Sequence, residues 1–131
     1  MPPESQIERE LSRANAASER AERLGRLLTL SHEPMFMWQL NGPIEFWNIG
    51  AERLYGFTRE EAIGQISHAL LQTKFPVEFT EWIAQLQNEL HWSGELRHVC
   101  KDGREVIVES RQQLLSDDTV LEVNRDNRRS V

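Results

Sequence analysis

The chain has 131 residues, enough for one compact domain with an added helix or tail but not for two complete domains. Hydrophobic residues make up 39% and charged residues 27%, which is the balance of a globular protein rather than a disordered one. The net charge of -6 argues against direct contact with nucleic acid or an anionic membrane. The single cysteine, Cys100, cannot close a disulfide within the chain, and no apolar run is long enough to span a bilayer, so we expect a cytoplasmic protein.

Residues 1–31 are predicted to form one long amphipathic helix, because their apolar positions are spaced by threes and fours. The mean spacing is close to the coiled-coil value, although small residues in the middle weaken the apolar stripe. Two interpretations stay open: the helix packs on its own domain, or it pairs with its copy in a parallel homodimer. The dimer contacts would then come from Ile7, Leu11, Leu24 and Leu28.

The middle of the chain predicts a β-hairpin followed by helices. Two strands, 35–40 and 44–48, flank an Asn-Gly-Pro turn, and apolar side chains at both alternations indicate that both faces of this hairpin are covered. Helical segments follow at 51–55, after the capping box that begins at Thr58, at 67–71 and at 77–90.

Three further strands are predicted at 93–100, 104–115 and 119–124. The order of helix, two strands, helices and three strands predicts an α+β fold, with a five-stranded antiparallel sheet and helices grouped on one face.

Two stretches of this sequence resemble the PAS domains of bacterial sensor histidine kinases. The first runs from Ile44 to Gly64 and the second, in three pieces, covers 92–96, 101–103 and 121–126. The resemblance covers residues 32–126 and leaves 127–131 as a tail or a truncated output linker. Its fold and signalling motif is carried by Asn48, Gly56, Gly64, Trp92, Gly94 and Asp126.

The resemblance implies a ligand cleft between the helices and the inner face of the sheet, and a flanking helix on the outer face. We expect the cleft to be lined by apolar residues of facing elements and by one histidine that shares its strand alternation with Leu96. These residues are Phe46, Leu54, Phe79, Ile83, Leu86 and His98. His68 and His91 are expected at the surface or at helix caps.

The sequence offers no pattern for a cofactor, a metal or catalysis. A flavin photosensor of this family would carry a thiol in the stretch Ile66–Gln72, and a haem sensor would carry a histidine within 77–90; both are missing. The histidines show no metal-ligand spacing, and no nucleophile or nucleotide-binding motif is present. We therefore expect no haem, no flavin, no metal and no enzymatic activity in this chain, although an unidentified small ligand remains open.

The functional expectation is a sensory module that relays a small-molecule or protein signal through flanking helices to an output domain. That output domain is expected to be a histidine kinase in two-component signal transduction. The alternative is a ligand-free dimerisation domain. A third interpretation, a small cone-shaped α+β enzyme, lacks a paired histidine and aspartate.

Overall fold

The computed structural model describes residues 6–9, 26 and 32–127. Residues 6–9 are helical, and Ile7 among them is 69% exposed. Residue 26 is helical as well. The other residues of the predicted N-terminal helix, including Leu11, Leu24 and Leu28, lie outside the described residues, as does the end of the predicted tail.

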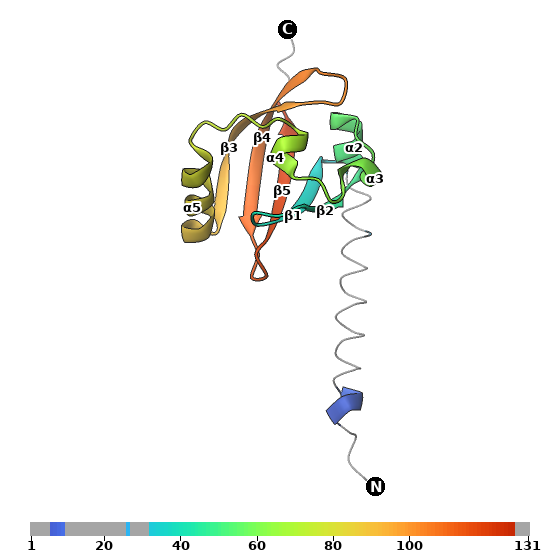
Figure 1. Cartoon of the computed structure of the whole chain (residues 1–131), viewed down its shortest axis with the longest axis vertical. Coiled ribbons are helices and arrows are strands. Elements are labelled where there is room, and N and C mark those ends of the chain that lie inside the picture. Colours follow the sequence, from blue (N-terminus) through green and yellow to red (C-terminus); the bar gives the residue numbers. More distant parts are fainter. Residues whose placement is uncertain (1–5, 10–25, 27–31, 128–131) are drawn as a thin grey trace.

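Five strands form one antiparallel sheet, as predicted (Figure 1). They are β1 (Met35–Gln39), β2 (Ile44–Trp47), β3 (His91–Val99), β4 (Glu105–Leu114) and β5 (Thr119–Asp126). Their order in the sheet is β2-β1-β5-β4-β3, so the first and last strands of the sequence pair with each other near its centre.

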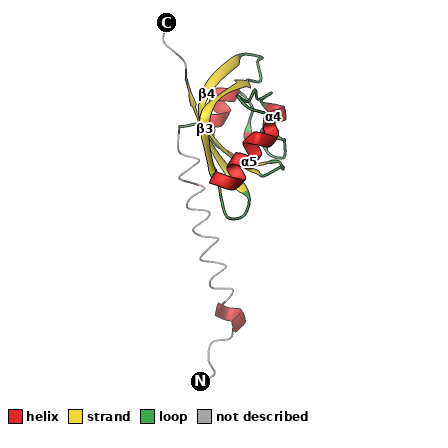
Figure 2. Ribbon diagram, turned by 90° about the vertical axis from the view of Figure 1, so that its left-hand side faces the viewer, coloured by secondary structure: helices red, strands yellow, loops and turns green. Residues whose placement is uncertain are grey.

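The described helices of the domain cover one face of this sheet (Figure 2). They are α2 (Ile49–Tyr55), α3 (Arg59–Ala62), α4 (Ser67–Leu70) and α5 (Phe79–Glu89). The sequence explains several of their ends. Asn48 caps α2 by accepting a hydrogen bond from the Ala51 amide at 2.9 Å, and Thr58 forms the predicted capping box of α3.

Helix α5 begins at Phe79, two residues later than predicted, and Leu90 ends it in a left-handed conformation with φ of 66°. The helix turns Trp82, Ile83 and Leu86 toward the sheet, where all three are buried. These three residues form an apolar stripe, and this stripe is the contact of the helix with the core.

A register shift between Met37 and Trp38 decides which side chains of the first hairpin face the helices. Trp47 lies opposite Phe36 and Ile44 lies opposite Trp38, and all four are buried on the inner face. Phe46 lies opposite Met37 and is only half-buried, on the outer face. The prediction that Phe46 lines the inner cleft was wrong, because the irregularity changes the simple alternation of β2.

Candidate functional site

The inner face of the sheet carries buried polar side chains among its apolar ones. Strand alternation places Ser110 and Gln112 of β4, and Glu122 and Asn124 of β5, on the same face as the buried Val108 and Val120. His98 of β3 lies on this face as well and is 1% exposed. These groups are out of contact with solvent, so each needs a hydrogen-bond partner within the protein or a bound molecule.

Tyr55 joins helix α2 to two strands through its hydroxyl group. The Tyr55 oxygen lies 2.7 Å from Nδ1 of His98, and Asn124 Nδ2 donates to the same oxygen at 3.0 Å. His98 Nδ1 is the partner within reach of the Tyr55 hydroxyl proton, and in the tautomer that accepts this proton the imidazole proton lies on Nε2. Burial lowers the pKa of His98 to about 3 and raises the pKa of Tyr55, so both groups are neutral near pH 7.

Glu122 is a buried carboxyl group with neutral hydrogen-bond donors. Trp38 Nε1 donates to its Oε1 at 3.1 Å, and Asn124 Nδ2 donates to its Oε2 at 2.8 Å. Within the described part of the chain, no lysine or arginine lies at ion-pair distance from it. Burial therefore raises the pKa of Glu122 to about 7, against the opposing effect of the two donors. We call Trp38, Tyr55, His98, Glu122 and Asn124 the core polar cluster.

A small cavity of about 10 Å³ adjoins this cluster, which is room for about one water molecule. Glu122 and His98 form part of its wall; the other lining residues are Phe36, Ser67, His68, Thr73, Phe75, Trp82 and Leu96. Three buried polar atoms nearby have no hydrogen-bond partner among the described residues: Trp82 Nε1, Gln112 Oε1 and Asn124 Oδ1. The core thus contains unused hydrogen-bonding capacity.

Of the predicted cleft residues, His98 alone lines the core cavity. Leu54, Ile83 and Leu86 are buried in the surrounding hydrophobic core, and Phe79 is half-buried against it. His68, expected at the surface or at a helix cap, lies within α4 and is half-buried; its ring lies 4.7 Å from that of Phe79, and burial lowers its pKa.

Sequence reasoning missed Gln112, Glu122 and Asn124. Each lies an even number of positions from a buried valine of its own strand, and therefore on the same face as that valine. That alternation was visible in the sequence and could have indicated that these polar residues face the core.

The residues of the fold and signalling motif stand at turns, caps and close contacts. Gly56 and Gly64 have φ of 82° and 89°, a left-handed region that favours glycine. A Cβ on Gly94 would lie 2.9 Å from the buried ring of Trp92.

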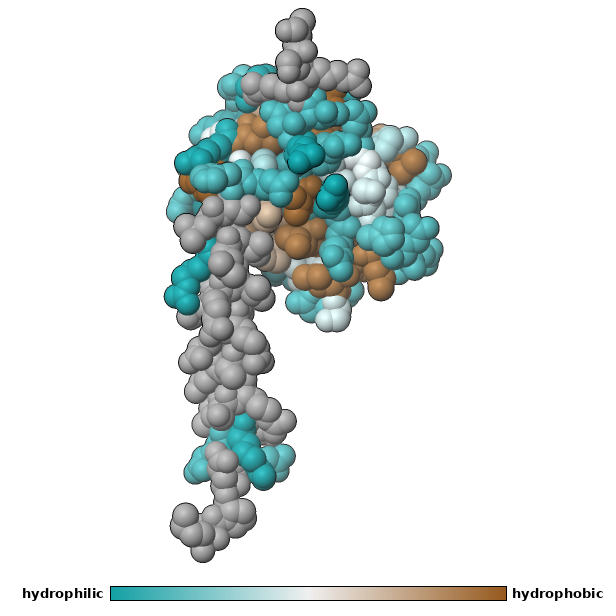
Figure 3. All heavy atoms as spheres, turned by 180° about the vertical axis from the view of Figure 1, so that it is seen from behind, coloured by the Kyte–Doolittle hydropathy of each residue, from teal (hydrophilic) through white to brown (hydrophobic). Residues whose placement is uncertain are grey.

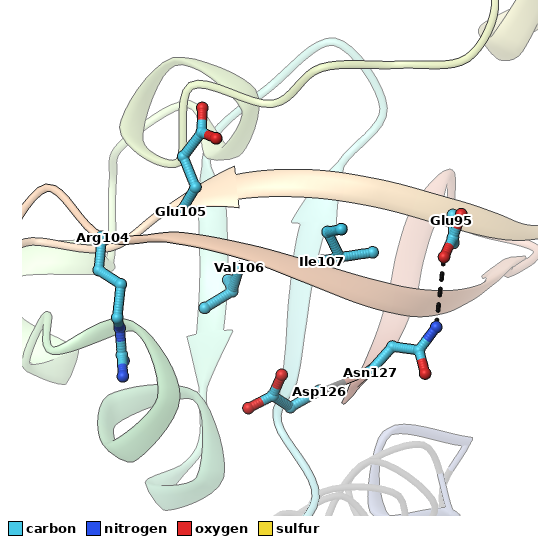
Figure 4. A pocket seen from close by; sticks show the side chains of 7 residues that line it. All are labelled: Glu95, Arg104, Glu105, Val106, Ile107, Asp126 and Asn127. Atoms are coloured by element: carbon cyan, nitrogen blue, oxygen red, sulfur yellow. Dashed lines mark hydrogen bonds between the residues drawn. The ribbon is translucent and has the colours of Figure 1, made fainter. Parts of the chain in front are cut away.

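Asp126 ends β5 beside a surface hollow of about 460 Å³ (Figure 4). Here Asn127 Nδ2 donates to Glu95 Oε1 at 3.2 Å. The hollow lies at the end of the strands and is separate from the core cavity, with no lining residue in common.

The outer face of the sheet carries an apolar surface, visible from behind in Figure 3. It consists of half-buried side chains that face one another across β1, β2 and β5: Met35 opposite Val123, and Met37 between Leu121 and Phe46. We call these five residues the outer apolar surface. Two of the strands that carry it, β1 and β5, also carry Trp38 and Glu122 of the core polar cluster on their other face.

The described residues bring together no group of three side chains able to hold a metal ion. No helix among them is long and apolar enough to cross a membrane.

The fold and its core define a small α+β module in which helices cover one face of an antiparallel sheet. The family model described as the PAS fold matches residues 22–123, and the chain belongs to this family.

Solved structures agree with this assignment. A PAS domain of a protein from Colwellia psychrerythraea is 27% identical, with a TM-score of 0.67, covering 81% of this chain and 95% of that one. A PAS domain from a two-component sensor histidine kinase is 16% identical, with a TM-score of 0.73 and coverage of 85% and 99%. The LOV domain of a blue-light activated histidine kinase from Erythrobacter litoralis is 14% identical, with a TM-score of 0.61 and coverage of 74% and 97%. No curated protein gave a significant match.

Proposed function

We propose that this chain is the sensory module of a signalling protein, in which a signal acting on the core polar cluster is relayed to an output domain. The observation that carries the proposal is the cluster itself. Hydrogen bonds join buried groups of β1, α2, β3 and β5 into one network. Apolar side chains would fill this core without needing hydrogen-bond partners, so a polar network there supports a role beyond packing.

The relay runs through the strands that have both the cluster and the outer apolar surface. Glu122 lies between Leu121 and Val123 on β5, and Trp38 follows Met37 on β1. A change in the hydrogen bonds of Glu122 therefore acts on strands whose opposite side carries the outer apolar surface. In this proposal the helix of residues 1–31 covers that surface and pairs with its copy in a homodimer. The output domain is a histidine kinase of a two-component system, which performs the catalysis that this chain does not.

A second candidate is a ligand-free dimerisation domain, which the small cavity favours because side chains already fill the core. Native mass spectrometry of freshly purified protein tests this second candidate. A small molecule retained by the protein would reject it.

The relay can be tested by fusing the chain to the catalytic core of a sensor histidine kinase. Tyr55→Phe removes the hydroxyl group that joins α2 to β3 and β5, and we expect kinase autophosphorylation to change by about fivefold or more. Glu81→Gln, at an exposed position of α5, is the matched control and should leave the rate unchanged. Equal rates in a folded Tyr55→Phe fusion and in the unsubstituted fusion would reject the relay.

A further inference from the structure

Glu122 pairs across the sheet with a residue whose side-chain oxygen is buried and lacks a donor among the described residues. Gln112 and Glu122 are direct partners across β4 and β5, with both side chains on the inner face. Side chains in such pairs start about 5 Å apart at Cβ, which brings a glutamate and a glutamine within hydrogen-bonding reach. Gln112 Nε2 donates to Ser110 Oγ at 3.0 Å, and Gln112 Oε1 accepts no hydrogen bond among the described residues.

A buried carboxyl group in this position binds different partners in its two protonation states. When ionised it is an acceptor only, and both of its oxygens already have a donor, from Trp38 and Asn124. When neutral it also has an O–H group, which needs an acceptor. Asn124 turns its amide nitrogen toward Glu122, so its own oxygen is directed elsewhere, and the unpartnered Oε1 of Gln112 lies on the residue that pairs with Glu122.

We propose that Glu122 and Gln112 form a proton-binding site, in which Glu122 takes up one proton from solvent and donates it in a hydrogen bond to Gln112 Oε1. Taking this proton as the signal of the module rests on the function proposed above. Loss of the proton leaves two acceptor oxygens facing each other. The Gln112 amide then turns over, so that Nε2 donates to Glu122 and Ser110 Oγ–H donates to Gln112 Oε1. Proton uptake thus exchanges hydrogen bonds between β4 and β5.

The raised pKa of Glu122 has burial as its largest cause and the donors Asn124 and Trp38 as opposing ones, with no charged side chain among its causes. The titratable groups nearest the cluster are Tyr55 from α2, His98 from β3, His68 from α4, Cys100 after β3 and Asp126 at the end of β5. Tyr55 and His98 are neutral near pH 7 for the reasons given above. β1, β4 and α5 contribute neutral groups, which are Trp38, Gln112 and Trp82.

The indole N–H of Trp38 is a direct reporter of the Glu122 charge, because it donates to Glu122 Oε1. We would follow the tryptophan side-chain resonances of the whole chain in ¹H–¹⁵N spectra between about pH 5 and 8. The Trp38 resonance should move with a midpoint of about 7. Trp47, whose indole donates to the Phe57 backbone oxygen at 3.0 Å, is an internal control.

Three variants make the test specific. Glu122→Gln should remove the titration and hold Trp38 near its low-pH position, because the amide N–H takes the place of the carboxyl O–H. Glu109→Gln, an exposed position on β4, should leave the midpoint unchanged. Gln112→Met keeps the size of the side chain and removes both the acceptor of the neutral carboxyl group and the donor to the ionised one. The hydrogen bond to the ionised form is the stronger of the two, so the midpoint should rise by about one pH unit, a tenfold gain of proton affinity.

A Trp38 resonance that stays fixed over this range, or that titrates equally in Glu122→Gln, would overturn the proton site. A midpoint unchanged in Gln112→Met would overturn the role of Gln112. The kinase fusion tests the relay independently of the proton site. If Glu122 titrates but the kinase fusion ignores Tyr55→Phe, the proton site stands without the relay. If Glu122 is silent but the fusion responds, only the proton site is rejected.

Discussion

The oxygen of Tyr55 and Nδ1 of His98 lie 2.7 Å apart, and this contact joins the end of helix α2 to the edge strand β3. No other tyrosine is present in the chain, and the hydroxyl group is fully buried with two partners. Through this hydroxyl group, Tyr55 links helix α2 to strands β3 and β5.

Removing this hydroxyl group should destabilise the fold. In Tyr55→Phe, His98 Nδ1 loses its partner and stays buried, which costs about 1–3 kcal/mol of unfolding free energy. Urea denaturation against unsubstituted protein measures the loss, with Ser116→Ala as an exposed hydroxyl control. A loss below about 0.5 kcal/mol would mean that the contact contributes no net stability.

The pH dependence of stability should show the burial of Glu122. Its pKa is about 7 in the folded protein and 4.5 as the ordinary value, so the folded state holds the proton more tightly than the unfolded chain. Stability from this group is fully present below about pH 4.5 and is lost as pH rises through about 7. The unfolding free energy, compared with that of Glu122→Gln at each pH, should fall by about 3 kcal/mol. A difference that stays constant with pH would show that the carboxyl group is not perturbed.

A methyl group at position 94 should disturb the core. The added Cβ of Gly94→Ala would meet the Trp92 ring at 2.9 Å, and this ring is 5% exposed, so it has little room to move. We expect a loss of about 1–3 kcal/mol, the usual cost of overpacking. Thermal and urea unfolding would measure it beside Ser93→Ala on the exposed side of the same strand. Wild-type stability in Gly94→Ala would show that the sheet shifts freely at this point.

The purified protein should be colourless. The stretch Ile66–Gln72 has no thiol, helix α5 has no histidine, and the core cavity of about 10 Å³ is far smaller than a flavin or haem. An absorption spectrum of the protein as isolated checks this. A flavin band or a Soret band in that spectrum would contradict it.

The N-terminal helix should hold two chains together. Ile7, one residue of the predicted apolar stripe, is largely exposed and available to a second copy. Light scattering at micromolar concentration should show a dimer for the full chain and a monomer after removal of residues 1–20. A monomeric full chain, or a truncated chain that remains dimeric, would assign the contact elsewhere.

Much of the fold was predictable because local signals agreed with one another. The Asn48 and Thr58 caps, the glycine after α2 and the apolar stripe of α5 each have a local physical cause. The site was harder to predict. The outward position of Phe46 depends on a register shift between two strands, and the pairing of Gln112 with Glu122 depends on how β4 and β5 align across the sheet. Neither alignment has a signal within a single segment.

The pairing of β1 with β5 also sets the order of assembly. Met35 and Val123 are partners at the centre of the sheet although almost the whole domain separates them in sequence. Such distant pairing requires closure of a long loop, which slows folding. During synthesis the hairpin of β1 and β2 has no partner strand until β5 has left the ribosome. Until then the edge of β1 that pairs with β5 is open to chaperones and to other nascent chains.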